Sequence, residues 1–114
     1  MLDWDRINEL RGEVGDAEFQ LILEMFLDEV EGVMMRLSSE DPVRLETDLH
    51  FLKGCAWNLG FSAFGGLCDE GERQIGEDRS AQISIADVMT CYSESKKMLM
   101  QGLDAALHPL RRAQ

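Results

Sequence analysis

Apolar side chains recur along most of the chain at the three- and four-residue spacing of an amphipathic helix. Residues 16–37 carry one such stripe, which consists of Phe19, Leu23, Phe26, Val30, Val33 and Leu37. The stripe in residues 42–60 consists of Leu45, Leu49, Leu52, Ala56 and Leu59. The stripes after these consist of Phe64, Leu67, Cys68, Gly71 and Ile75, and of Ile85, Val88, Tyr92, Leu99, Leu103 and Ala106. No segment alternates with the period of two that is typical of a half-buried strand.

A shorter helix is expected before these four segments. One side of it is apolar, with Trp4, Ile7 and Leu10. Asp3 is suited to cap its start and Gly12 to stop it, so that a turn would follow up to Gly15. Four long amphipathic helices with short connections predict an all-α fold, an antiparallel up-down four-helix bundle with a short additional N-terminal helix. The first helix would pack across the end of this bundle.

Capping residues set the expected ends of the two helices that follow. We expect Asp16 to cap the first long helix, which would run to about Leu37. Asp41 would cap the second, with Pro42 at its first helical position. This helix should end near Gly60, since glycine adopts the left-handed cap conformation readily.

The third and fourth long helices carry weaker signals. The third, in residues 63–76, contains Gly65, Gly66 and Gly71, small residues that would let it approach the second helix closely. A larger apolar residue than Gly71 would be expected to pack better. A polar loop is expected at residues 77–82. Ser84 with Asp87 forms a variant of the capping box for the last helix. Pro109 would stop that helix before a basic tail.

The length and the net charge of the chain indicate how many domains it forms and which partners it does not bind. A chain of 114 residues is expected to form a single domain over residues 1–114. The net charge of −11 argues against binding to nucleic acid or to an anionic membrane surface. No apolar run is long enough to span a membrane and no signal peptide is evident, so a cytoplasmic location is expected. The N-terminal Met1 and the caps at both ends favour a free-standing chain.

The three cysteines are expected to be structural. Cys55, Cys68 and Cys91 are widely spaced and match no zinc pattern. The sequence therefore predicts small core residues with free thiols in a reducing compartment, and no metal site.

The helix in residues 42–60 carries the candidate chemistry. His50 and Lys53 lie one turn apart, at or beyond the edge of the apolar stripe. An imidazole is a potential nucleophile near neutral pH, and an adjacent ammonium can neutralise an anion attached to it. Gly54 leaves space beside the imidazole for another molecule. These three residues predict a phosphoryl group that is carried on His50, stabilised by Lys53 and given steric clearance by Gly54.

The same stretch resembles a known family. His50, Lys53, Gly54 and Gly60 form the pattern H-x-x-K-G-x-x-x-x-x-G, followed by a Leu67-Cys68 pair in the next helix. This pattern is similar to the signature of histidine-containing phosphotransfer (HPt) domains, the relay modules of multistep two-component signalling. Cys55 and Trp57 depart from it, because small residues are frequent at these positions in the family.

The resemblance implies a phosphorelay carrier that is not itself an enzyme. His50 would accept a phosphoryl group from the aspartate of a response regulator receiver domain, on Nε2, and pass it to another receiver aspartate. The expected partners are receiver domains and a hybrid histidine kinase, and the chain is expected to be a monomer. No cofactor is expected on the chain, since Mg²⁺ would be held by the receiver. The alternative is a helical adaptor that binds receivers or other signalling proteins without being phosphorylated.

Neighbouring side chains extend the candidate site. Trp57 shares the face of His50, and an exposed tryptophan suggests a partner-binding residue, although packing against the next helix is equally compatible with its position. Phe51 is assigned to the same partner-binding surface. Asn58 is expected to be structural. Met34 and Met35 are expected in the core.

Overall fold

The computed structural model describes residues 1–79 and 82–107. Within these residues the chain is all-helical, with no strand, as the sequence predicts. None of the described helices combines the length and the apolar character that crossing a membrane requires. The five helices are α1 (Trp4–Val14), α2 (Asp16–Met34), α3 (Pro42–Leu59), α4 (Ser62–Glu77) and α5 (Ile85–Leu107).

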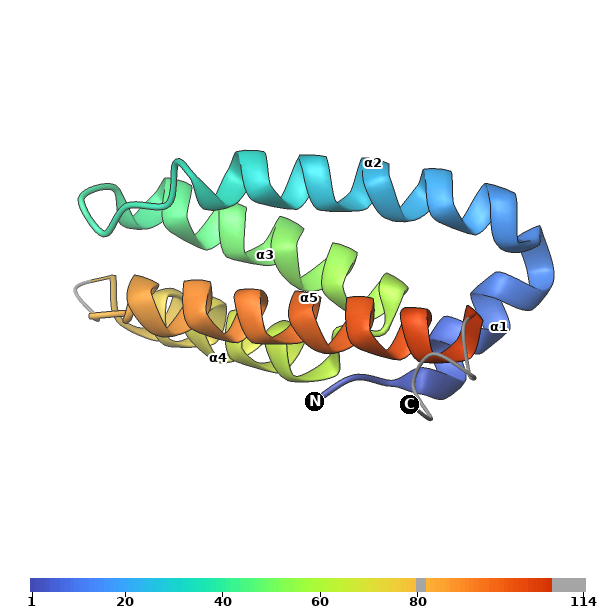
Figure 1. The fold of residues 1–114 in the computed structure, drawn as a ribbon. Helices are drawn as coiled ribbons and strands as arrows, with labels where there is room; N and C mark the ends of the chain where they lie inside the picture. The colour runs from blue at the N-terminus through green and yellow to red at the C-terminus, as the bar shows by residue number, and fades with distance from the viewer. Residues whose placement is uncertain (80–81, 108–114) are drawn as a thin grey trace.

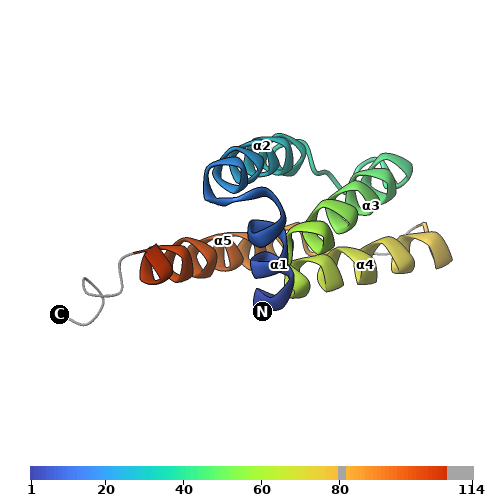
Figure 2. The ribbon, with the colours of Figure 1, turned by 90° about the vertical axis from the view of Figure 1, so that its right-hand side faces the viewer.

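The four long helices lie lengthwise, and the chain reverses direction at each connection between them (Figure 1). α3 and α4 form the closest pair, while α2 packs on α3 and α5 packs on α4. α1 lies at one end and contacts α2 and α3. Figure 2, which looks toward that end, shows α1 in front, with α2 and α3 above α5 and α4. His50 and Lys53 on α3 therefore have α4 as their closest neighbouring helix.

The junction between α1 and α2 lies later in the chain than predicted. Asp3 caps α1 as expected, because its carboxylate accepts a hydrogen bond from the Arg6 backbone N–H at 3.0 Å. The predicted stop at Gly12 is wrong, because α1 continues to Val14. Gly15, with φ of 85°, ends α1 and precedes α2. Gly12 keeps a negative φ, so Gly15 and not Gly12 breaks the helix. Asp16 is therefore the first residue of α2 and makes no capping hydrogen bond.

The end of α2 also differs from the prediction. α2 stops at Met34, three residues before Leu37, although Leu37 still packs against the core from the following segment. Met34 is buried as predicted, but the prediction for Met35 is wrong because its side chain is 87% exposed. Gly32 lies inside α2, and a Cβ there would meet no atom within 4 Å. Its place in α2 has no packing explanation.

The predicted caps of α3 are confirmed. The Asp41 carboxylate accepts a hydrogen bond from the Arg44 N–H at 3.2 Å, and Pro42 is the first helical residue. Gly60 ends the helix in the left-handed region, with φ of 93°. Its carbonyl accepts a hydrogen bond from the Asp3 N–H at 2.7 Å. The same glycine thus ends α3 and fixes the chain just before α1.

Glycines permit the close packing of α3 against α4. A Cβ at Gly65 would lie 2.3 Å from the indole of Trp57, and a Cβ at Gly71 would lie 3.1 Å from Cδ1 of Leu49. The predicted close approach of the two helices is therefore confirmed. The expectation that a larger residue would pack better at position 71 is wrong, because Leu49 already occupies that space.

α5 begins as predicted. The Ser84 hydroxyl accepts a hydrogen bond from the Asp87 N–H at 3.2 Å. The predicted stripe supplies buried side chains from Val88, Tyr92, Leu99 and Leu103. The predictions for the Ala106 side chain, for Pro109 and for the basic tail lie outside the described residues, as does the middle of the predicted loop at 77–82.

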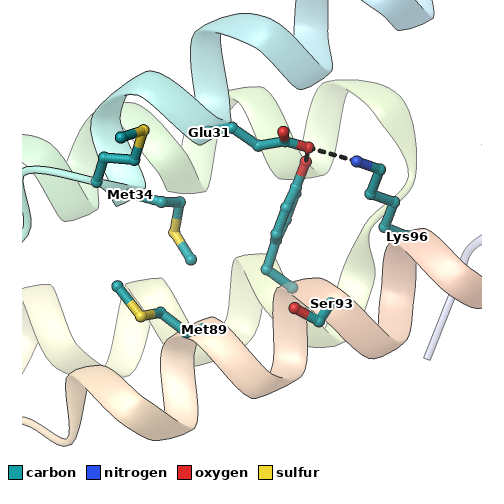
Figure 3. A pocket seen from close by; sticks show the side chains of 7 residues that line it. Glu31, Met34, Met89, Ser93 and Lys96 are labelled. Atoms are coloured by element: carbon teal, nitrogen blue, oxygen red, sulfur yellow. Dashed lines mark hydrogen bonds and ion pairs between the residues drawn. The ribbon is translucent and has the colours of Figure 1, made fainter.

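A groove of about 400 Å³ separates α2 from α5 (Figure 3). It is lined by Glu31, Met34, Met35, Met89, Tyr92, Ser93 and Lys96. Oε2 of Glu31 accepts hydrogen bonds from the Tyr92 hydroxyl at 2.6 Å and from Lys96 Nζ at 2.7 Å, which joins the two helices. These hydrogen bonds, from Lys96 and from Tyr92, hold the pKa of Glu31 below its ordinary value.

Replacing Tyr92 by phenylalanine is expected to weaken this link. The Tyr92→Phe variant keeps the buried ring but loses the hydrogen bond to a partly exposed carboxylate, so we expect it to lower the free energy of unfolding by about 1 kcal/mol. Urea unfolding measures the change. Ser93→Ala removes a hydroxyl from an exposed position in the same groove and is expected to change stability by less than about 0.5 kcal/mol. Equal stabilities of the two variants would contradict a structural role for the link.

Candidate phosphoryl-carrying site

α3 presents His50 at its surface. Ala56, Leu49 and Leu52 bury one face of the helix, which leaves His50 on the outside with 69% of its side chain exposed. Lys53 lies on the neighbouring turn, and only 18% of its side chain is exposed. The apolar periodicity of the helix thus places an accessible imidazole beside a largely enclosed ammonium group.

Glu72 of α4 binds the His50 imidazole. Its Oε1 lies 2.7 Å from Nδ1 of His50. Burial raises the pKa of Glu72, but the ammonium of Lys53 and the hydrogen bond with His50 outweigh burial and hold the pKa below its ordinary value. A carboxylate can only accept, so Nδ1 must donate its proton to Glu72. In the neutral ring the free electron pair is then on Nε2, which makes Nε2 the nucleophilic nitrogen.

Lys53 lies between two carboxylates and an aromatic ring. Its Nζ is 2.7 Å from Oε2 of Glu72 and 3.3 Å from Oδ1 of Asp69. The ammonium also lies 5.8 Å from the centroid of the Trp57 ring. The hydrogen bond with Glu72 raises the pKa of Lys53, against the opposing effect of burial, and Asp69 raises it further. Lys53 is therefore positively charged and placed next to the imidazole through their shared partner, Glu72.

Comparison with protein families identifies the chain. Residues 21–112 match the family model described as Hpt domain. The chain belongs to the HPt domain family. Comparison with curated proteins and with solved structures found no match. Members of this family are phosphocarriers that work with receiver domains and histidine kinases in phosphorelays.

Gly54 leaves open space in this HPt domain. A Cβ at this position would meet no atom within 4 Å, so the packing of α3 does not require a glycine. In mid-helix a glycine costs about 1 kcal/mol relative to alanine. Its role as clearance beside His50 stays a prediction, and the open surface is compatible with it.

The two aromatic residues assigned to partner binding differ in their surroundings. Trp57 is 49% exposed and covers Gly65 of α4, so its ring both packs against the neighbouring helix and presents a surface to solvent. Phe51 is 40% exposed. Neither exposure identifies a partner, and their function in docking stays a prediction.

Two site residues were missed by the sequence analysis. Glu72 and Asp69 are three positions apart on α4, one turn on the same side of the helix. Their spacing was visible in the sequence, but acidic pairs at this spacing are common on exposed helix faces. Their relation to His50 depends on the register between α3 and α4, which the sequence alone does not give.

Asn58 is structural, as predicted. Arg6 of α1 donates hydrogen bonds to the Asn58 carbonyl at 2.9 Å and to its side-chain oxygen at 3.0 Å. These contacts fix α1 to the last turn of α3. Asn58 therefore stabilises the end of the helix that carries His50, and does not contact the imidazole.

The cysteines are free thiols. Cys68 is buried in the core, and burial raises the pKa of its thiol to about 12. Burial also raises the pKa values of Cys55 and Cys91. Since the thiolate is the reactive form, all three positions are chemically quiet. Within the described part of the chain, no group of three or more His, Cys, Asp or Glu side chains is placed to hold a metal ion.

Proposed function

We propose that this HPt domain carries a phosphoryl group on Nε2 of His50, accepting it from a receiver aspartate and passing it to the aspartate of another receiver. The observation that carries the proposal is the hydrogen bond between His50 Nδ1 and the Glu72 carboxylate. It leaves the electron pair on Nε2 of a largely exposed ring. Such an imidazole is prepared for nucleophilic attack without an additional base.

The proposed transfer balances without a cofactor on this chain. The Nε2 electron pair attacks phosphorus in line, and the bond between phosphorus and the aspartate oxygen breaks with its electrons left on the receiver carboxylate. The Nδ1 proton stays in place, so the ring becomes positively charged. Glu72 then faces this positive ring at 2.7 Å and stabilises it. Mg²⁺ on the receiver would supply the remaining charge stabilisation.

Lys53 is the proposed partner of the phosphoryl oxygens. Its Nζ already lies beside the carboxylate that binds the imidazole, so a short movement of the side chain would bring it to a group on Nε2. The phosphoryl group carries more negative charge than either present partner of Lys53 and offers three acceptor oxygens. Lys53 would therefore move part of its interaction from Glu72 to the phosphoryl group.

The surface around His50 is the proposed receiver-binding face. Trp57 and Phe51 supply exposed aromatic area, and the open space at Gly54 lets a partner approach the imidazole. The directions of α2 to α5 are compatible with an up-down four-helix bundle that serves as a rigid support for this face. The domain would act as a monomeric cytoplasmic carrier with no kinase or ATPase activity of its own.

A receiver panel tests the proposal. The purified protein is mixed with phosphorylated receiver domains from its own organism, and label on the chain is tested for acid lability and base stability. Acid-labile, base-stable label is the expected result, and it also names a partner. Receivers that bind the chain without labelling it would contradict the proposal and support the adaptor function.

Glu72→Gln is expected to slow phosphoryl uptake by about ten- to a hundredfold, the size of effect found when the carboxylate partner of a metal-bound histidine is changed. The amide removes the charge that stabilises the positive ring, and its NH₂ can donate to Nδ1, which would move the ring proton to Nε2. Initial rates of labelling measure the effect. Glu70→Gln is the matched control on the same helix, since Glu70 pairs with Arg73 and not with His50. A rate for Glu72→Gln equal to that of this control would contradict the assigned role.

A further inference from the structure

The site on α3 and α4 carries an excess of negative charge before any phosphoryl group arrives. Lys53 provides one positive charge, whereas Asp69 and Glu72 provide two carboxylates within 3.3 Å of it. The nearest other charged residues before His50 on α3 are also paired, since Asp48 binds Arg36 and Glu46 binds Arg79, so they add no net charge. A neutral His50 therefore belongs to a cluster whose net charge is negative.

The two carboxylates would respond differently to phosphorylation. Glu72 contacts Nδ1 of His50, so the positive ring that forms on transfer gains a favourable partner. Asp69 contacts Lys53, whereas the imidazole is hydrogen-bonded to Glu72. The negative charge of Asp69 would compete with the phosphoryl oxygens for Lys53 and would repel them.

We infer that Asp69 destabilises the phosphorylated form of His50. The exchange equilibrium with receivers is thereby shifted toward release of the phosphoryl group from this chain. The inference rests on the proposed function and adds a direction to it. Asp69 does not contact the reacting atoms, and it acts on the phosphoryl group through its ion pair with Lys53. On release, the Nε2–phosphorus bond breaks, its electrons return to Nε2, and a receiver carboxylate oxygen forms the new bond to phosphorus. Lys53 then returns to Asp69 and Glu72, as in the present structure.

The equilibrium of exchange with one receiver tests this inference. Asp69→Asn is compared with wild type by measuring the final distribution of phosphoryl group between the two proteins. Removing one partly screened negative charge near a phosphoryl group should move the equilibrium toward this chain by about three- to tenfold. The equilibrium constant compares free species, so it is insensitive to changes in docking affinity. Glu70→Gln removes the same charge one residue away and is expected to change the constant by less than about twofold.

A second measurement needs no receiver. The small phosphoryl donor phosphoramidate would load His50 in a His108→Gln background, and ³¹P NMR would follow protonation of the phosphoryl oxygens against pH. Asp69→Asn should lower the pH of that protonation relative to Glu70→Gln, because a nearby negative charge favours the protonated group. Equal titrations of the two variants, or an exchange equilibrium that moves away from this chain, would overturn the inference. If no receiver exchanges with wild type, the proposed function fails, and the titration still decides the role of Asp69.

Discussion

Replacing His50 by glutamine is expected to lower phosphoryl uptake by more than about a thousandfold, because the amide side chain has no nucleophilic electron pair comparable to that of imidazole. No other described group takes over its position, since Lys53 is held as a cation by Glu72 and Asp69. Labelling by a cognate phosphorylated receiver measures the loss. The substitution is expected to lower the rate of phosphoryl transfer and to leave the affinity for the receiver unchanged.

The folded state should tolerate this change. His50 is largely exposed, and surface substitutions of this kind change the free energy of unfolding by less than about 0.5 kcal/mol. His108→Gln is the matched control, because it removes the other histidine of the chain and should leave labelling unchanged. Label that persists in His50→Gln and disappears in His108→Gln would transfer the carrier role to the second histidine and contradict the assignment.

Gly60→Ala is expected to lower the free energy of unfolding, because the substitution both strains the backbone at the end of α3 and creates a clash with the start of α1. The φ of 93° places a Cβ in the left-handed region, which costs about 1–2 kcal/mol for an ordinary residue. That Cβ would also lie 2.8 Å from the Asp3 carbonyl oxygen and 2.8 Å from Cγ1 of Ile7. Relief of this clash must shift α1 against the end of α3, so the total cost should be about 2–4 kcal/mol.

The matched control is the same substitution at Gly32. That position is helical and open, so alanine should raise the free energy of unfolding by about 0.5–1 kcal/mol. Urea unfolding of both variants gives the two changes on one scale. The free energy of unfolding is expected to fall in Gly60→Ala and to rise in Gly32→Ala. A Gly60→Ala variant as stable as wild type would show that the junction between α3 and α1 is more adaptable than its geometry indicates.

Much of the fold could be predicted because its signals are local. Asp3, Asp41 and Gly60 act on backbone groups within a few residues of themselves, so their types and positions indicate their roles. The positions of His50 and Lys53 outside the buried stripe follow from the apolar periodicity of α3, although α4 encloses most of the Lys53 side chain. These features need no knowledge of which helices meet.

The remaining features depend on contacts between distant segments. Gly12 and Gly15 are both plausible stops by composition, and only the path of the chain decides between them. Met35 differs from Met34 by one helical step, which moves it from the core to solvent. Glu72 reaches His50 only because of the register in which α4 packs on α3, which the sequence does not show. The sequence thus indicated His50 as the candidate nucleophile but not the carboxylate that binds its imidazole.

The nitrogen that carries the phosphoryl group on the labelled protein decides whether His50 Nε2 is the nucleophile. After transfer from a receiver, ³¹P NMR distinguishes Nε2-phosphohistidine from Nδ1-phosphohistidine, and the His50→Gln variant assigns the signal to its residue. The expected result is a single Nε2-phosphohistidine signal that is absent from His50→Gln. An Nδ1-phosphohistidine signal, or a signal that survives in this variant, would contradict the assignment of Nε2 as the nucleophile set by Glu72.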